Sequence, residues 1–248
     1  MRKRSLAPRW TAIACLLGLV LTSCNSADEN RVELYVAASL SASFEELATT
    51  FEAAHPDVDI VIIAAGSPSL VRQLTEGAPG EILATANQET MAQAVAAGVA
   101  FDPKSFAVNE AVLVAAADLT GTSLAELDSL VLAVCDPSVP CGAAAVQLFA
   151  ELDVTPTPAT LETSVRGVLA KLSLGEVDAA VIYRTDLAGS LADKDFLPLT
   201  AANGVAIPVI SPIAATAEDV SDEARMFLAF VMSEEAQNIL TDYGFGTP

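Results

Sequence analysis

Four short motifs place small or polar residues where a strand-like run gives way to a helix-like one. Backbone N–H groups at such a position belong to a helix N-terminus at the carboxyl end of a sheet. A helix N-terminus carries about half a positive charge and can bind an oxyanion without any cationic side chain. The motifs therefore predict an anion site built from neutral donors. They are Ala37-Ala38-Ser39-Leu40, Ala65-Gly66-Ser67-Pro68, Val139-Pro140-Cys141-Gly142 and Thr163-Ser164-Val165-Arg166.

Ser67 and Pro68 give the sharpest local prediction among these motifs. A residue before proline is disfavoured in the α region, which suits an N-cap, and proline is favoured at the first helical position. We therefore expect Ser67 to cap a helix over 68–76 and to present its hydroxyl and amide outward. The alternative for Ser39, Ser67 and Ser164 is that each caps only its own helix.

The sequence holds no motif typical of catalysis. It has no Gly-x-Ser-x-Gly elbow, no P-loop lysine and no Gly-x-Gly-x-x-Gly. His55 is the only histidine, and it stands beside Pro56 between an expected helix and an expected strand. We therefore expect a protein that is not an enzyme and has neither a cofactor nor a cation site. An exported hydrolase is the less favoured alternative, because it would need a nucleophile beside His55.

The N-terminus is typical of an exported lipoprotein. A basic start, an apolar stretch over 11–21 and the ending Leu-Thr-Ser-Cys24 resemble a signal peptide with a lipobox. We expect a signal peptide over 1–23, lipidation of Cys24 and a polar tether over 24–31. The protein would then be anchored at the outer face of the cytoplasmic membrane, not span it. An ordinary signal peptide with a chance cysteine is the alternative.

The charge is strongly acidic. The chain has 32 acidic and 12 basic residues, for a net charge of −20. Four basic residues and no acidic ones precede Cys24, so the remainder has a net charge of −24. This charge excludes nucleic acid as a partner. It also opposes anion capture at long range, but salt screens it beyond roughly 8 Å, so dipoles in a cleft can still dominate.

Two of the four cysteines remain once Cys15 and Cys24 are assigned to the N-terminal segment. Cys135 and Cys141 are six residues apart, and disulfides persist in exported proteins. We expect them to be bonded, with a stabilisation of about 2 kcal/mol from loop closure. A two-thiolate metal site is the alternative, but it lacks histidine partners.

Strand-like and helix-like patterns alternate along the chain, which predicts an α/β architecture with mostly parallel sheets. The run over 58–65 is almost wholly apolar, as in a strand buried on both faces. The run over 207–215 contains Pro208 and Pro212, which place it at an edge or a crossover. Strands are expected at 33–38, 58–65, 81–86, 111–117, 130–134, 179–183 and 207–215, and helices at 41–54, 68–76, 88–97, 143–152, 164–174, 221–230 and 234–243.

The length suggests two lobes of about 100 residues. The stretches 109–113 and 205–209 are the best candidates for crossings between them. The first lobe would then comprise 32–110 and 208–248, and the second 111–207.

Several motifs resemble the periplasmic molybdate-binding proteins, and the likeness runs in order from about residue 32 to 246. The matching segments are Ala-Ala-Ser-Leu at 37–40, Gly-Ser-Pro-Ser-Leu-Val-Arg-Gln-Leu at 66–74, Glu-Gly-Ala-Pro at 76–79, Asp-Pro-Ser-Val-Pro-Cys-Gly at 136–142, Ser-Val-Arg-Gly-Val-Leu-Ala at 164–170, Ala-Val-Ile-Tyr at 180–183 and Ser-Glu-Glu-Ala-Gln-Asn-Ile-Leu-Thr-Asp-Tyr-Gly-Phe at 233–245.

The resemblance implies a two-lobed periplasmic-binding-protein fold of type II, with mostly parallel sheets, helices on both faces and the ligand in a cleft between the lobes. It also implies a monomer that hands molybdate or tungstate to an ABC transporter permease in the cytoplasmic membrane. The implied contacts are the hydroxyls of Ser39, Ser67 and Tyr183 and the amides of Cys141 and Val165.

Three positions depart from the family pattern. Cys141 stands where an alanine is expected, and an amide contact tolerates that change. Glu81 and Asn87 replace expected aspartates that have a structural role.

Arg166 is either a source of positive potential or a surface residue. Sulfate, phosphate and an organic carboxylate remain alternative ligands on the same fold.

Overall fold

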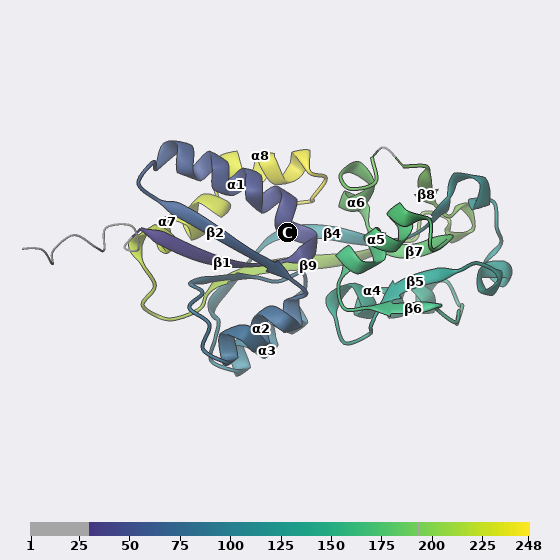
Figure 1. Cartoon of the computed structure of the whole chain (residues 1–248), viewed down its shortest axis with the longest axis horizontal. Helices are drawn as coiled ribbons and strands as arrows, with labels where there is room; N and C mark the ends of the chain where they lie inside the picture. The colour runs from purple at the N-terminus through teal and green to yellow at the C-terminus, as the bar shows by residue number, and fades with distance from the viewer. Residues whose placement is uncertain (1–29, 193) are drawn as a thin grey trace, which may run out of the picture.

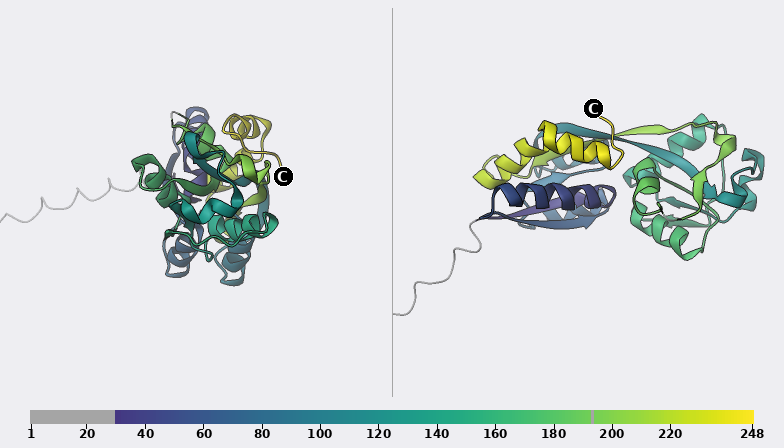
Figure 2. Two further views of the ribbon diagram at one scale, coloured as in Figure 1. Left: turned by 90° about the vertical axis from the view of Figure 1, so that its right-hand side faces the viewer. Right: turned by 90° about the horizontal axis from the view of Figure 1, so that it is seen from above.

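The computed structural model describes residues 30–192 and 194–248. Two lobes lie end to end, and the long strands β4 (Phe101–Ala116) and β9 (Ile207–Ala215) run from one into the other (Figures 1 and 2). The signal peptide predicted over 1–23, the lipidation predicted at Cys24 and nearly all of the tether lie outside the described residues. Within the described part, no helix is both long enough and apolar enough to cross a membrane.

Lobe 1 denotes the half that contains the first described strand, β1, and the C-terminal helices (Figure 1). Its strands flank the crossing pair on one side, and its helices lie over both faces. Its elements are β1 (Arg31–Ala37), the 3-10 turn η1 (Ala38–Leu40), α1 (Ser41–Ala54), β2 (Asp59–Ala65), α2 (Ser67–Thr75), β3 (Ile82–Ala84), α3 (Gln88–Ala96), α7 (Asp222–Val231) and α8 (Glu234–Asp242).

Lobe 2 denotes the half built from the intervening chain. Its elements are η2 (Ala117–Leu119), η3 (Leu124–Ser129), β5 (Leu132–Cys135), α4 (Pro140–Glu151), β6 (Thr160–Glu162), α5 (Val165–Leu174), β7 (Ala179–Tyr183), α6 (Arg184–Ala188), β8 (Phe196–Pro198) and η4 (Thr200–Ala202).

One mixed sheet runs through both lobes in the order β2-β1-β3-β9-β4-β7-β5-β6, with β8 paired to β4. In lobe 1, β1 is parallel to β2 and β3, and in lobe 2, β5 is parallel to β6 and β7. The crossing strands pair antiparallel with each other and with β3, β7 and β8. Parallel β–α units therefore build each lobe, and an antiparallel ribbon joins the two.

Each lobe has its own apolar core. In lobe 1, the Phe44 ring meets Phe106 edge-on at 5.5 Å, and Phe51 meets Phe227 edge-on at 5.2 Å. Edge-to-face pairs of this kind add about 0.5–1.5 kcal/mol beyond the area that they bury. The core of lobe 2 collects around the strands β5 and β7 and helices α4 and α5. Separate cores let the lobes move as units about the ribbon.

One expectation about strand position needs correction, and a second one is confirmed. The apolar run of β2 is the edge strand of the sheet, and most of its residues are only partly buried. Helices α1 and α2 contact it but leave most of its residues partly exposed, so the strand is not fully buried on both faces. The expectation for 207–215 is confirmed, because β9 is one of the two strands that cross from one lobe into the other (Figure 1). It pairs with β3 only through residues 213–215, so Pro208 and Pro212 lie where β4 is its one neighbouring strand.

Candidate functional site

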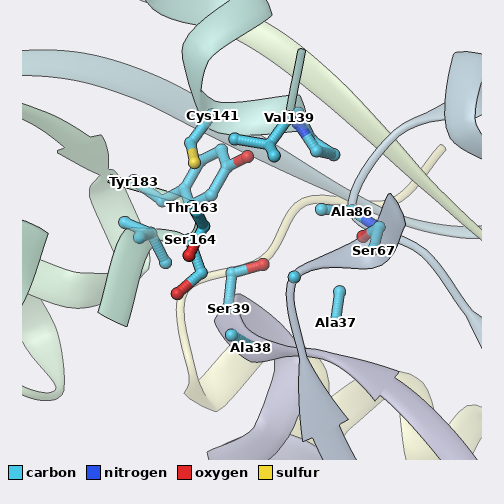
Figure 3. A pocket seen from close by; sticks show the side chains of 13 residues that line it. Ala37, Ala38, Ser39, Ser67, Ala86, Val139, Cys141, Thr163, Ser164 and Tyr183 are labelled. Carbon is cyan, nitrogen blue, oxygen red and sulfur yellow. The ribbon is translucent and has the colours of Figure 1, made fainter. Parts of the chain in front are cut away.

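A cavity lies between the lobes at the carboxyl ends of β1, β2, β5 and β7 (Figure 3). All five residues predicted as ligand contacts line it. None of its lining residues, all of which are in the described part of the chain, carries a charged side chain. The lining comprises Ala37, Ala38, Ser39, Gly66, Ser67, Ala86, Val139, Pro140, Cys141, Thr163, Ser164, Val165 and Tyr183.

Lobe 1 contributes two serines to this cavity. Ser39 lies in η1 directly after β1 and is partly exposed. Ser67 is 2% exposed, and its Oγ accepts a hydrogen bond of 3.1 Å from the N–H of Ala86. That bond fixes the oxygen, and the hydroxyl hydrogen of Ser67 remains available to the cavity. In Figure 3, the oxygens of both serines lie at the space between the lobes.

The expectation that Ser67 caps α2 is wrong. Gly66 is the N-cap, in an extended conformation, and Ser67 is the first residue of the helix. The Ser67 hydroxyl bonds to a neighbouring strand connection instead of its own helix end. Ser164 does occupy the N-cap of α5, but its side chain makes no capping bond. The reading in which these hydroxyls serve only their own helices therefore fails for Ser67 and Ser164.

Lobe 2 contributes two helix N-termini. Cys141 lies in the first turn of α4, and Val165 is the first residue of α5. No acceptor for the backbone N–H of either residue occurs within the described part of the chain, as is usual for first-turn amides. Both residues are largely buried. Buried N–H groups without a protein partner need a ligand or water, so both amides are available to an anion.

The disulfide predicted between Cys135 and Cys141 is present. It joins the last residue of β5 to the first turn of α4 and so closes the loop that leads into the cavity wall. Gly142 lies under this loop so closely that a Cβ there would be 1.9 Å from the Asp136 carbonyl oxygen. The loop that presents the Cys141 amide is therefore held covalently and by tight packing.

Tyr183 ends β7 and is 2% exposed. Its hydroxyl is buried and has no hydrogen-bond partner among the described residues, and Figure 3 shows the ring beside Cys141 with its oxygen toward the cavity. Burial is the main reason that the pKa of Tyr183 is raised well above its usual value, and the nearby Asp186 carboxylate raises it further. The hydroxyl therefore keeps its proton and acts as a donor. A buried polar group without a partner costs about 1–3 kcal/mol, which a ligand acceptor would remove.

Asp186 is a buried carboxyl group three residues after this donor. Its carboxylate accepts the N–H of Tyr183 at 2.9 Å, and it is 7% exposed. Burial raises the pKa of Asp186 to about 7, against the lowering effect of the Tyr183 hydrogen bond. The charge of Asp186 therefore changes near neutral pH, and its hydrogen bond links it to Tyr183, which lines the cavity.

The cavity also has lining residues that the sequence did not predict as contacts, among them Ala86 and Thr163. Gly66 lies against lobe 2, since a Cβ on it would stand 2.6 Å from the Thr163 carbonyl oxygen. The φ of Gly66 is −61°, which any residue can adopt. Glycine is therefore required because the backbone of lobe 1 approaches Thr163 so closely, and not because of its own conformation. Gly66 in the second motif was the one sequence feature that could have indicated this close approach. The sequence does not show that its neighbour is Thr163, almost 100 residues away.

The arrangement suits a small anion. About 20 Å³ is open to the centres of water-sized particles, and one water needs about 10–15 Å³ by that measure. This space therefore suits an ion of a few atoms. No cluster of three or more histidine, cysteine, aspartate or glutamate side chains suited to a metal ion occurs among residues 30–192 and 194–248.

Comparisons with known proteins agree with this geometry. The family model described as bacterial extracellular solute-binding protein matches residues 32–246. The molybdate-binding protein ModA of Mycobacterium tuberculosis is 33% identical over 223 residues, which cover 88% of this chain and 85% of that protein. The periplasmic molybdate-binding protein of Azotobacter vinelandii superposes with a TM-score of 0.73 at 19% identity and covers 88% of this chain and 99% of that chain. The sulfate-binding protein SubI of M. tuberculosis superposes equally well, with a TM-score of 0.73 at 16% identity and coverage of 88% and 87%. The family match over most of the chain, together with the ModA relatives, shows that the chain belongs to the bacterial extracellular solute-binding proteins, among the molybdate-binding members of ABC transporter systems.

Proposed function

We propose that this protein captures molybdate or tungstate outside the cytoplasm and delivers it to the permease of an ABC importer. The anion would lie between the lobes, held by the hydroxyls of Ser39, Ser67 and Tyr183 and by the amides of Cys141 and Val165. The observation that carries the proposal is the buried Tyr183 hydroxyl, which faces an uncharged cavity without a partner in the described chain. The ModA relatives supply the ligand class.

Neutral donors suit a doubly negative tetrahedral ion. Each charge-assisted hydrogen bond contributes about 1.5–3 kcal/mol, so five such bonds can replace much of the hydration shell. The two helix N-termini add their dipoles at the same place. No cationic side chain is needed, which fits the absence of charge from the cavity lining.

The same donor set gives selectivity. Phosphate keeps a proton at neutral pH, and that proton would meet another donor with no acceptor to receive it. The Ser67 oxygen is already occupied by the Ala86 N–H, and the Tyr183 hydroxyl retains its proton, so both present hydrogens to the ion. Sulfate is smaller than molybdate, and its oxygens would fall short of some donors.

We propose that the mature protein is a monomeric lipoprotein attached through Cys24, with its signal peptide over 1–23 and a tether over 24–31. The proposed lobe boundaries are 32–110 with 208–248 and 111–207. They are supported by the separate cores, one of which uses residues 111–209 and the others residues on both sides of that range. The tether would keep the protein at the membrane that holds the permease.

A hydrolase has little support. His55 stacks on Phe51 at 4.3 Å, at the end of α1, and does not line the cavity. The proteins of the matching family bind solutes, and the described residues offer no nucleophile paired with this histidine in a hydrogen bond. A His55→Ala variant should therefore bind the anion as the wild type does.

Isothermal titration calorimetry tests the proposal directly. The purified protein is titrated with molybdate, tungstate, sulfate and phosphate, in a metal-chelating buffer that excludes bridging cations. We expect tight 1:1 binding of molybdate and tungstate and weak or no binding of the other two. Tight sulfate binding without molybdate binding would assign the protein to the alternative ligand, and no heat with any of the four would end the proposal.

A further inference from the structure

A polar contact joins the two lobes beside the cavity. The Arg166 guanidinium, at the start of α5 in lobe 2, donates a hydrogen bond of 2.6 Å to Ser41 Oγ, at the start of α1 in lobe 1. The two residues are 125 positions apart in the chain. Ser41 is 6% exposed, whereas Arg166 is largely exposed. Neither residue lines the cavity.

Both partners are attached directly to the walls of the cavity. Ser41 follows η1, and its hydroxyl donates to the Ala38 carbonyl oxygen at 3.1 Å. Arg166 follows Val165, whose amide faces the cavity, and α5 packs against η1. The hydrogen bond therefore ties the wall that carries Ser39 to the wall that carries Val165.

We propose that Arg166 and Ser41 form an interlobe clasp that holds the cleft closed over the anion and slows its release. This inference rests on the proposed function. Arg166 is a positioning residue in this scheme, because it acts on the two walls and does not touch the ligand. Its place at the first turn of α5 lets it reach across once the lobes meet.

The clasp has little effect on the open form. When the lobes separate, Arg166 returns to water, and Ser41 keeps its bond to Ala38. A hydrogen bond to a charged group is worth more than a neutral one, but exposure of Arg166 to solvent reduces its contribution. Loss of the clasp should therefore speed anion release by roughly three- to tenfold and leave capture almost unchanged.

Two single variants separate the clasp from simple electrostatic attraction. Arg166→Gln removes both the bond and a positive charge, whereas Ser41→Ala removes the bond and keeps the charge. Arg225→Gln is the matched control, because it removes one charge from an exposed helix position where Arg225 pairs only with Asp219 and Asp222 among the described residues. The double variant of Arg166 and Ser41 completes a thermodynamic cycle.

To measure release, each protein is loaded with radioactive molybdate, and the loss of label is recorded after an excess of unlabelled molybdate is added. The rate of capture is measured separately. We expect faster release in both single variants, no further change in the double variant, unchanged release in the control and an unchanged melting temperature of the ligand-free proteins. Arg166→Lys should restore part of the slow release.

Two outcomes would overturn the clasp alone: wild-type release rates in both single variants, or faster release in Arg166→Gln with no change in Ser41→Ala. The second result would assign Arg166 a purely electrostatic effect. A lower melting temperature of the ligand-free variants without faster release would assign the contact to folding. Failure of the wild type to bind any of the four oxyanions would overturn the clasp and the proposed function together.

Discussion

Replacement of Gly66 by alanine should separate binding from folding. A Cβ at this position would stand 2.6 Å from the Thr163 carbonyl oxygen of lobe 2, and an ordinary contact begins at about 3.4 Å. The lobes would have to stay about 0.8 Å further apart at this point. Hydrogen bonds of about 2.9 Å from one lobe to the anion would then exceed 3.6 Å, at which distance they are no longer hydrogen bonds.

The loss of binding free energy follows from the number of hydrogen bonds to the anion that cannot form. If two charge-assisted bonds are lost, at about 1.5–3 kcal/mol each, affinity falls by at least about a hundredfold. The ligand-free protein should hardly change. The φ of Gly66 suits alanine, which favours folding, whereas alanine is a poorer N-cap than glycine, so the net effect should stay below about 1 kcal/mol.

Calorimetry with molybdate and thermal unfolding of the ligand-free protein measure the two effects. Gly121→Ala is the matched control, because a Cβ there meets no atom within 4 Å and the backbone is not left-handed. We expect the control to bind like the wild type. Wild-type affinity in Gly66→Ala would refute the reasoning, since the lobes would then close without this approach. A large loss of stability in the ligand-free form would refute it too.

Three further predictions concern lobe 2. Tyr183→Phe should weaken molybdate binding by roughly ten- to a hundredfold in calorimetry without lowering stability, because it removes a buried hydroxyl that has no described protein partner; unchanged affinity would exclude Tyr183 from the site. Asp186 has a folded pKa of about 7, above its unfolded value, so its protonated form favours folding at low pH and this contribution is lost as pH rises from about 4 to 7. Denaturant unfolding should therefore show Asp186→Asn gaining stability relative to the wild type over that window, on the order of 2–4 kcal/mol, and a pH-independent difference would contradict the assignment. Replacing Cys135 and Cys141 together by serine should lower stability by about 2 kcal/mol and weaken anion binding, because the loop before α4 is then free to move; a stability loss with intact binding would show that packing under Gly142 suffices.

Local patterns predicted the elements that local physics determines. The helix over 41–54 and the strands over 179–183 and 207–215 have the expected bounds. The helices expected over 221–230 and 234–243 are also present, and Ser221 and Ser233 cap them, each accepting an N–H from its own helix. The pattern failed for β4, which begins at Phe101, because Asp102, Pro103 and Lys104 interrupt its alternation and a bulge accommodates them.

The candidate site shows the same division. The four strand-to-helix motifs predicted residues that meet in one cavity at the carboxyl ends of the strands. The resemblance to the molybdate-binding proteins, and not the motifs, implied Tyr183 and the contacting atoms. The sequence could not show that Gly66 touches Thr163 or that Arg166 reaches Ser41, because these contacts depend on how two separately folded lobes meet. Nor could it show that the Ser67 oxygen bonds to Ala86 instead of capping a helix.

The ribbon of β4 and β9 has a consequence for unloading. All the groups that would hold the anion come from distant parts of the chain, and the two paired strands are the continuous link between their supports (Figure 2). Under the proposed function, a membrane partner would therefore empty the protein by binding the outer surfaces of the two lobes and bending that link. Such a partner would need no group that competes for the oxyanion. The anion would leave because separation of the two lobes breaks the hydrogen bonds that hold it.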